Sequence, residues 1–179
     1  MKKNILYAII ALIIAIVFLV PSVREKLQEL FLPIAKVQEA VSISADDYNI
    51  SLKGINTPNA NLADFKDEML FLNFWGTWCP PCRQEWGSIQ KLYEAKKDKL
   101  NFVLIAMQDE EPAVRKFLEE NKYTAPVYIA ESPISDKLLP KSFPTTFIIS
   151  NRGQILKKET GALDWNSSNI HQFIDNLSR

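Results

Sequence analysis

The segment NFWGTWCPPCRQEW, residues 73–86, contains both cysteines of this 179-residue chain, Cys79 and Cys82. An apolar run over residues 69–74 precedes the pair, and apolar residues at helical spacing follow it, so the sequence predicts a strand leading into a cysteine-headed helix. The free N–H groups and the dipole at a helix N-terminus favour an anion, which lowers the pKa of a thiol from about 8.5. A Cys79 thiolate could attack a disulfide, and Cys82 could then resolve the mixed disulfide.

Two other uses of the pair are weaker alternatives. A disulfide that closes so short a loop removes little chain entropy, so it would be a poor structural staple. A zinc site needs four ligands, and the only histidine, His171, lies near the end of the chain. We therefore predict a redox pair and no metal site.

Strands alternate with helices along the rest of the chain, which is typical of an α/β fold. The first half of the predicted order is a hairpin around 48–59, a strand over 69–74, the cysteine-headed helix and a strand over 102–107. A helix that buries Val114, Phe117 and Leu118 comes next, followed by a strand over 127–130 and a short helix over 135–139. The chain then forms a hairpin over 145–159 and a closing helix whose apolar face consists of Ile170, Phe173, Ile174 and Leu177. Residues 62–65 read as a short link. Because the closing hairpin adds antiparallel strands, we expect a mixed sheet.

The amino-terminal segment is apolar and uncharged from Ile5 to Val20, and Lys2 and Lys3 precede it. We predict that residues 1–23 form a single transmembrane anchor, since a membrane span needs about 17–25 residues. A cleaved secretion signal is the alternative, but the end of the run lacks the small residues of a cleavage site. The positive-inside rule places the amino terminus in the cytoplasm and the remaining chain outside.

The predicted domain organisation follows from this segment. Residues 24–47 are expected to be a stalk, and residues 48–179 a single catalytic domain. The 21 basic and 21 acidic side chains balance, so the composition gives no sign of nucleic-acid binding.

The segment WGTWCPPCR, residues 75–83, resembles the active-site segment of the thioredoxin superfamily, and in particular its membrane-anchored TlpA/ResA-like branch. The resemblance covers about residues 48–177. It implies a thioredoxin fold with a central mixed sheet flanked by helices, an N-terminal hairpin, and a strand–helix insert that matches residues 102–130. It also implies a cis proline opposite the cysteines, and Pro144 in SFPTTF is the candidate. The residues expected to line the substrate groove are Trp78, Phe143, Pro144 and Thr145.

The same resemblance assigns a proton-handling acid. Cytosolic thioredoxins carry a buried aspartate six positions before the first cysteine, where this chain has Asn73, which cannot titrate. The membrane-anchored branch often has a glutamate three positions after the second cysteine, and Glu85 stands there. Glu85 is therefore the expected third catalytic residue beside Cys79 and Cys82. An ordinary surface carboxylate on the helix is the alternative.

These observations predict an extracytoplasmic, membrane-anchored thiol-disulfide oxidoreductase. Pro80 and Pro81 remove two N–H donors near Cys79 and so favour a reducing couple. The resemblance implies disulfide-containing protein substrates, with apocytochrome c during cytochrome c maturation as one candidate, and a membrane thiol electron donor. It implies no cofactor. The alternatives are a thioredoxin-like thiol peroxidase, or a non-enzymatic copper-handling module with Met107 or Met69 as an added ligand.

Overall fold

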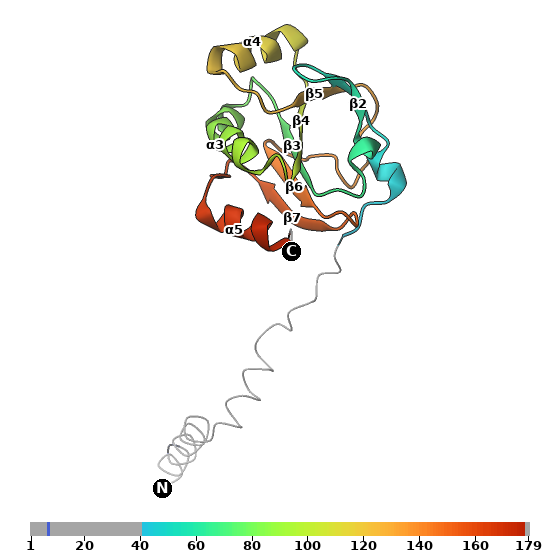
Figure 1. Cartoon of the computed structure of the whole chain (residues 1–179), viewed down its shortest axis with the longest axis vertical. Coiled ribbons are helices and arrows are strands. Elements are labelled where there is room, and N and C mark those ends of the chain that lie inside the picture. Colours follow the sequence, from blue (N-terminus) through green and yellow to red (C-terminus); the bar gives the residue numbers. More distant parts are fainter. Residues whose placement is uncertain (1–6, 8–40, 178–179) are drawn as a thin grey trace. The chain divides into compact units, whose positions relative to one another are not determined.

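The computed structural model describes residue 7 and residues 41–177 (Figure 1). Apart from residue 7, the predicted anchor over residues 1–23 lies outside the described residues, as does most of the predicted stalk over residues 24–47. No helix within the described part of the chain is both long enough and apolar enough to cross a membrane. The anchor therefore stays a prediction.

A seven-stranded mixed sheet forms the centre of the domain, in the order β2-β1-β5-β4-β3-β6-β7 (Figure 1). Strand β3 runs parallel to β4, and β4 runs parallel to β5, whereas the other neighbouring strands are antiparallel. The strands are β1 (Ser51–Gly54), β2 (Ala60–Asn61), β3 (Leu70–Trp75), β4 (Asn101–Ala106), β5 (Val127–Ala130), β6 (Thr145–Ile149) and β7 (Ile155–Thr160). This is the mixed sheet that the sequence predicts.

Three α-helices and two short 3₁₀ helices complete the described domain. The helices are α3 (Pro80–Lys96), α4 (Glu111–Asn121), α5 (Ser168–Leu177), η1 (Ala45–Tyr48) and η2 (Leu62–Phe65). The cysteines therefore stand at the start of the helix that follows β3, and β4, α4 and β5 form the expected strand–helix insert.

Side chains of β3 alternate between two hydrophobic clusters, one on each face of the sheet. Phe71 and Trp75 pack in the cluster that also holds buried residues of α3, α4 and α5. Leu72 and Phe74 pack in the cluster on the opposite face, with residues that precede β1 and residues of β6. Asn73 has the same parity as Phe71 and Trp75, so its side chain points toward the helices.

Two local expectations need correction. Residues 135–139 do not form a helix but a hydrogen-bonded turn, in which the carbonyl of Ser135 accepts from the N–H groups of Leu138 and Leu139. Buried Leu138 anchors this turn, and no further residues continue it. Residues 62–65 are not a plain link but η2, which Asn61 caps by accepting from Ala63 N.

The described chain enters the domain at the end of the sheet farthest from the cysteines. Ile43 N donates to Gly153 O and Ile155 N donates to Val41 O, so this segment lies against the β6–β7 turn. Because β6 is antiparallel to β3, that turn lies beside the start of β3, whereas Cys79 follows the end of β3.

Candidate active site

Cys79 and Cys82 form a disulfide at the start of α3, with a Cα–Cα distance of 5.3 Å. Cys79 is the N-cap residue, and its sulfur accepts a hydrogen bond of 3.3 Å from the backbone N–H of Cys82. Pro80 and Pro81 occupy the first two helical positions, where other residues would offer N–H groups. Cys79 is 3% exposed and Cys82 is fully buried, so only Cys79 has surface in contact with solvent.

Trp78, which immediately precedes Cys79, is held in one orientation although it is 49% exposed. Its indole N–H donates to the carbonyl of Met107 over 3.0 Å. A Cβ atom at Gly76 would lie 2.5 Å from Trp78 Nε1, so only glycine leaves room for the ring to fold back there. Trp78 therefore presents a fixed aromatic surface beside the disulfide.

The β4–α4 loop also holds the segment before the cysteines. Asp109 accepts from the backbone N–H of Thr77 at 2.6 Å and from the Thr77 hydroxyl at 2.9 Å. These two bonds tie the residue after Gly76 to the strand–helix insert. The position of the loop before Cys79 thus depends on residues that follow it by about 30 positions.

The peptide bond between Phe143 and Pro144 is cis, which confirms the expected cis proline. Phe143 meets Trp78 edge to face, with ring centroids 5.4 Å apart. The residues immediately before Cys79 and Pro144 are therefore in contact. The side chain of Thr145, which follows Pro144, is buried, and its hydroxyl donates to Ser142 O.

Glu85 is not a surface carboxylate, as it is only 3% exposed. Its Oε1 accepts from the side-chain amide of Asn73 at 3.0 Å. Its Oε2 accepts from the indole N–H of Trp165 at 3.0 Å and from the backbone N–H of Leu163 at 3.3 Å. Three elements, β3, α3 and the β7–α5 loop, thus converge on one carboxylate one helical turn after Cys82.

Burial raises the pKa of Glu85 above its ordinary value, because the desolvated site disfavours the charged form. The hydrogen bonds from Trp165, Leu163 and Asn73 act in the opposite direction and lower the pKa, without cancelling the effect of burial. A carboxyl group with a raised pKa can exchange protons closer to neutral pH.

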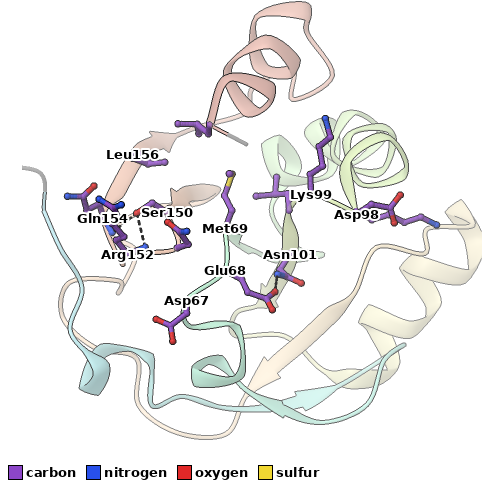
Figure 2. Close-up of a pocket in the computed structure, with 14 residues that line it drawn as sticks. Asp67, Glu68, Met69, Asp98, Lys99, Asn101, Ser150, Arg152, Gln154 and Leu156 are labelled. Carbon is purple, nitrogen blue, oxygen red and sulfur yellow. Dashed lines mark hydrogen bonds between the residues drawn. The ribbon is translucent and has the colours of Figure 1, made fainter. Parts of the chain in front are cut away.

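The pocket in Figure 2 lies away from this site. It has a volume of about 710 Å³ and contains Met69 and Asn101 at the starts of β3 and β4, with Arg152 and Gln154 from the β6–β7 turn (Figure 2). Neither cysteine and none of the expected groove residues line it. Among the described residues, no group of three or more His, Cys, Asp or Glu side chains could hold a metal ion.

The sequence did not indicate two of the contacts that shape the site. The sequence indicates only that Asn73 cannot titrate. In the structure, its side-chain nitrogen donates both to Glu85 and to Thr146 Oγ1. Parity along β3 groups Asn73 with Phe71 and Trp75, but the strand is apolar on both faces, so its sequence does not show which face the helices cover. No local sequence pattern indicates the contact between Trp165 and Glu85, because the two residues are 80 positions apart.

Comparisons with known proteins agree with this geometry. Residues 49–174 match the family model described as Redoxin. The thioredoxin-like protein YneN of Bacillus subtilis (strain 168) is 34% identical over 118 residues, which are 64% of this chain and 69% of YneN. The thiol-disulfide oxidoreductase ResA of the same strain is 30% identical over 140 residues, which are 77% of each chain.

Solved structures show the same fold. The crystal structure of StoA from Bacillus subtilis aligns with a TM-score of 0.57 at 24% identity, over 76% of this chain and 97% of StoA. A putative thiol:disulfide interchange protein DsbE from Chlorobium tepidum aligns with a TM-score of 0.62 at 22% identity, over 78% of this chain and 95% of that one.

This chain belongs to the Redoxin family, as a TlpA/ResA-like member of the thioredoxin superfamily. It is a thiol-disulfide oxidoreductase, and Cys79 and Cys82 form its CxxC pair.

Proposed function

We propose that this protein is a membrane-anchored disulfide reductase that acts outside the cytoplasm on disulfide-containing proteins. One structural observation carries the reducing direction. Among the first three helical positions of α3, only Cys82 offers an N–H group, and that group reaches Cys79 Sγ, because the other two positions are prolines. Fewer donors stabilise a Cys79 thiolate less, and a less stable reduced form makes a stronger reductant.

The reaction would proceed in two exchanges. The Cys79 thiolate attacks one sulfur of the substrate disulfide, so a mixed disulfide forms and the other substrate sulfur leaves as a thiolate. Cys82 loses its proton and attacks Cys79 Sγ, which restores the Cys79–Cys82 disulfide and releases the second substrate sulfur. Substrate gains two electrons and two protons, and a membrane dithiol donor must then reduce the protein again.

Glu85 is the proposed group that exchanges the Cys82 proton. It lies three residues after Cys82 on the same side of α3, and burial raises its pKa toward the working range. Glu85→Gln should slow disulfide reduction about 10- to 100-fold, at the low end of general acid–base effects. A pH–rate profile that overlays the parent profile would remove Glu85 from the mechanism.

Trp78, Phe143 and Pro144 form the proposed docking surface for an extended substrate segment. Trp78 and Phe143 are in contact, and the Trp78 ring is fixed by its bond to Met107. The buried side chain of Thr145 limits its proposed contribution to the backbone and to the turn before β6.

The direction of the reaction is tested by the reduction potential of the Cys79–Cys82 couple. We expect a value near that of thioredoxin, about −270 mV, when the protein is equilibrated with a glutathione buffer. A value near about −120 mV, as in a strong oxidant of the DsbA kind, would contradict the reductase proposal.

The location is tested separately. The full chain should be recovered in the membrane fraction with residues 1–23 still attached, and a membrane-impermeant thiol reagent should label reduced Cys79 in intact cells. Recovery of a soluble form that begins after residue 20, or labelling only after lysis, would contradict the anchored arrangement.

No observation favours the two alternative functions. Gly76 stands three positions before Cys79, where a peroxidase of the related type needs a threonine, and the Gly76 site is filled by Trp78. Met69 lines the pocket at the opposite end of the sheet. Met107 packs against the hydrophobic cluster on the sheet face away from α3, whereas the cysteines belong to the cluster on the α3 face. Neither methionine is therefore placed to bind copper together with the cysteines.

A further inference from the structure

The β7–α5 loop takes part in the site although it contributes none of the residues expected from the sequence. Trp165 is fully buried in this loop, and its ring meets Phe71 of β3 edge to face at 4.9 Å. Its indole N–H is directed at Glu85 Oε2. A buried tryptophan usually finds one partner for its single polar atom, and here that partner is the proposed proton carrier.

The loop itself is fixed to α3 by Ser88. The Ser88 hydroxyl accepts from Trp165 N at 3.1 Å and donates its single proton to the carbonyl of Glu85 at 2.7 Å, with the carbonyl of Leu163 at 3.3 Å. Ser88 and Glu85 are three residues apart on one helix. The loop that carries the indole donor is therefore anchored on the same helical turn as the carboxylate.

We propose that Trp165 is a positioning residue for disulfide exchange, which fixes Oε2 of Glu85 and keeps the carboxylate in its proton-exchanging orientation. The inference rests on the proposed role of Glu85. Trp165 would not touch the substrate or either sulfur. It would act by orienting Glu85 and by favouring the ionised form of its side chain.

The groups that pack on Glu85 are neutral, so its ionised form is stabilised only by hydrogen-bond donors. Asn73 faces it from β3, and Leu163 N and the Trp165 indole face it from the β7–α5 loop. The titratable neighbour on its own helix is Cys82, one turn earlier. The pKa shift of Glu85 has only burial and these three hydrogen bonds as causes.

Trp165→Phe removes the indole N–H and keeps an aromatic ring against Phe71. Trp86→Phe is the matched control, because Trp86 is also fully buried but its Nε1 has no hydrogen-bond partner among the described residues. Trp86 directly follows Glu85, so this control also measures what a smaller ring does to the same turn of α3.

The first measurement is the titration of the Glu85 side chain by carbon-13 NMR, assigned with Glu85→Gln. Trp165→Phe should raise the pKa of Glu85 by roughly one unit, because a hydrogen bond to a charged group is lost. Trp86→Phe should leave this titration in place. If Trp165→Phe does not fold, 3-benzothienylalanine at position 165 keeps the bicyclic shape without the N–H donor.

The second measurement is the pH profile of kcat/KM for disulfide reduction. Trp165→Phe should move the limb that depends on Glu85 to higher pH by the same amount, and should cause no shift when Glu85→Gln is also present. A parent-like titration and profile in Trp165→Phe, with an altered profile in Glu85→Gln, would overturn the inference alone. Parent-like profiles in both variants would instead overturn the proposed role of Glu85, and the inference with it.

Discussion

The side-chain amide of Asn73 donates a hydrogen bond of 3.0 Å to Glu85 Oε1 in the interior of the domain. Both side chains are almost fully buried, and Asn73 Oδ1 has no partner among the described residues. Asn73 stands six positions before Cys79, where cytosolic thioredoxins carry an aspartate. The neutral amide instead holds an acid that comes from the next helix.

Asn73→Asp should couple two buried carboxyl groups. Two adjacent carboxylates resist simultaneous ionisation, so the pair should retain one proton to higher pH and titrate as a unit. We expect the pH profile of disulfide reduction to shift to higher pH, and the protein to lose about 1–3 kcal/mol of stability. Thermal unfolding and the profile of kcat/KM measure the two effects.

Asn101→Asp is the control for this change. Asn101 also donates to a glutamate, Glu68, but at an exposed site at the opposite end of the sheet. Solvent screens the new charge there, so the activity profile should not move. Equal effects of Asn73→Asp and Asn101→Asp would show that the Asn73–Glu85 contact has no special place in the reaction.

The stability of the oxidised protein should depend on pH through Glu85. Burial raises its pKa in the folded state, so the unfolded chain loses the proton first as pH rises above about 4. The free energy of unfolding therefore falls from that pH until the raised pKa of the folded state is passed. Glu85→Gln lacks this loss, so its stability relative to the parent should increase from about pH 4 until the raised pKa of Glu85 in the folded protein is passed.

Urea unfolding of the parent and Glu85→Gln over this pH range tests the prediction. Glu119→Gln, at an exposed site on α4, supplies the control and should follow the parent curve. If the curves of Glu85→Gln and the parent stay parallel, the carboxyl group does not titrate differently in the folded protein.

Several features of the fold and of the site were predictable from the sequence, and others were not. The strand before the cysteines and the helix headed by Cys79 were predictable from local apolar patterns. The cis bond at Pro144 was expected from the resemblance to the thioredoxin superfamily. Glu85 was also expected from the family resemblance, which implies a glutamate three positions after the second cysteine. Its hydrogen bonds to Trp165 and Leu163 were not predictable, because these residues reach it from a loop about 80 residues away.

The continuous apolar composition of β3 concealed another relationship. A strand buried on both faces shows no alternation in its sequence, so nothing indicated which face Asn73 would share with Glu85. The turn at residues 135–139 was wrongly predicted as a helix for a related reason. Its apolar spacing reflects one buried side chain, Leu138, and not a helical face.

Gly76→Ala should disturb substrate docking without touching the cysteines. The added methyl group would overlap the Trp78 ring, 2.5 Å from Nε1, and should break the bond from the ring to Met107 O. We expect kcat/KM for a protein disulfide to fall about 10-fold or more, since displacing a docking group by roughly 1 Å can cost up to about 100-fold.

Gly87→Ala is the matched change within α3. A Cβ atom at Gly87 would meet only Tyr123 Oη at 3.8 Å, so alanine fits there and should stabilise the helix by about 0.5–1 kcal/mol. Its kcat/KM should equal that of the parent. A comparable loss of activity in both variants would mean that the orientation of Trp78 does not determine docking.

The division of roles between the two sulfurs is the central claim, and a trapping experiment tests it most directly. Cys82→Ser leaves Cys79 able to attack a substrate disulfide but removes the group that resolves the adduct. Mass spectrometry of the adduct formed with a disulfide substrate should find one mixed disulfide, through Cys79, whereas Cys79→Ser should form none. Adducts of equal yield through either sulfur would contradict the account.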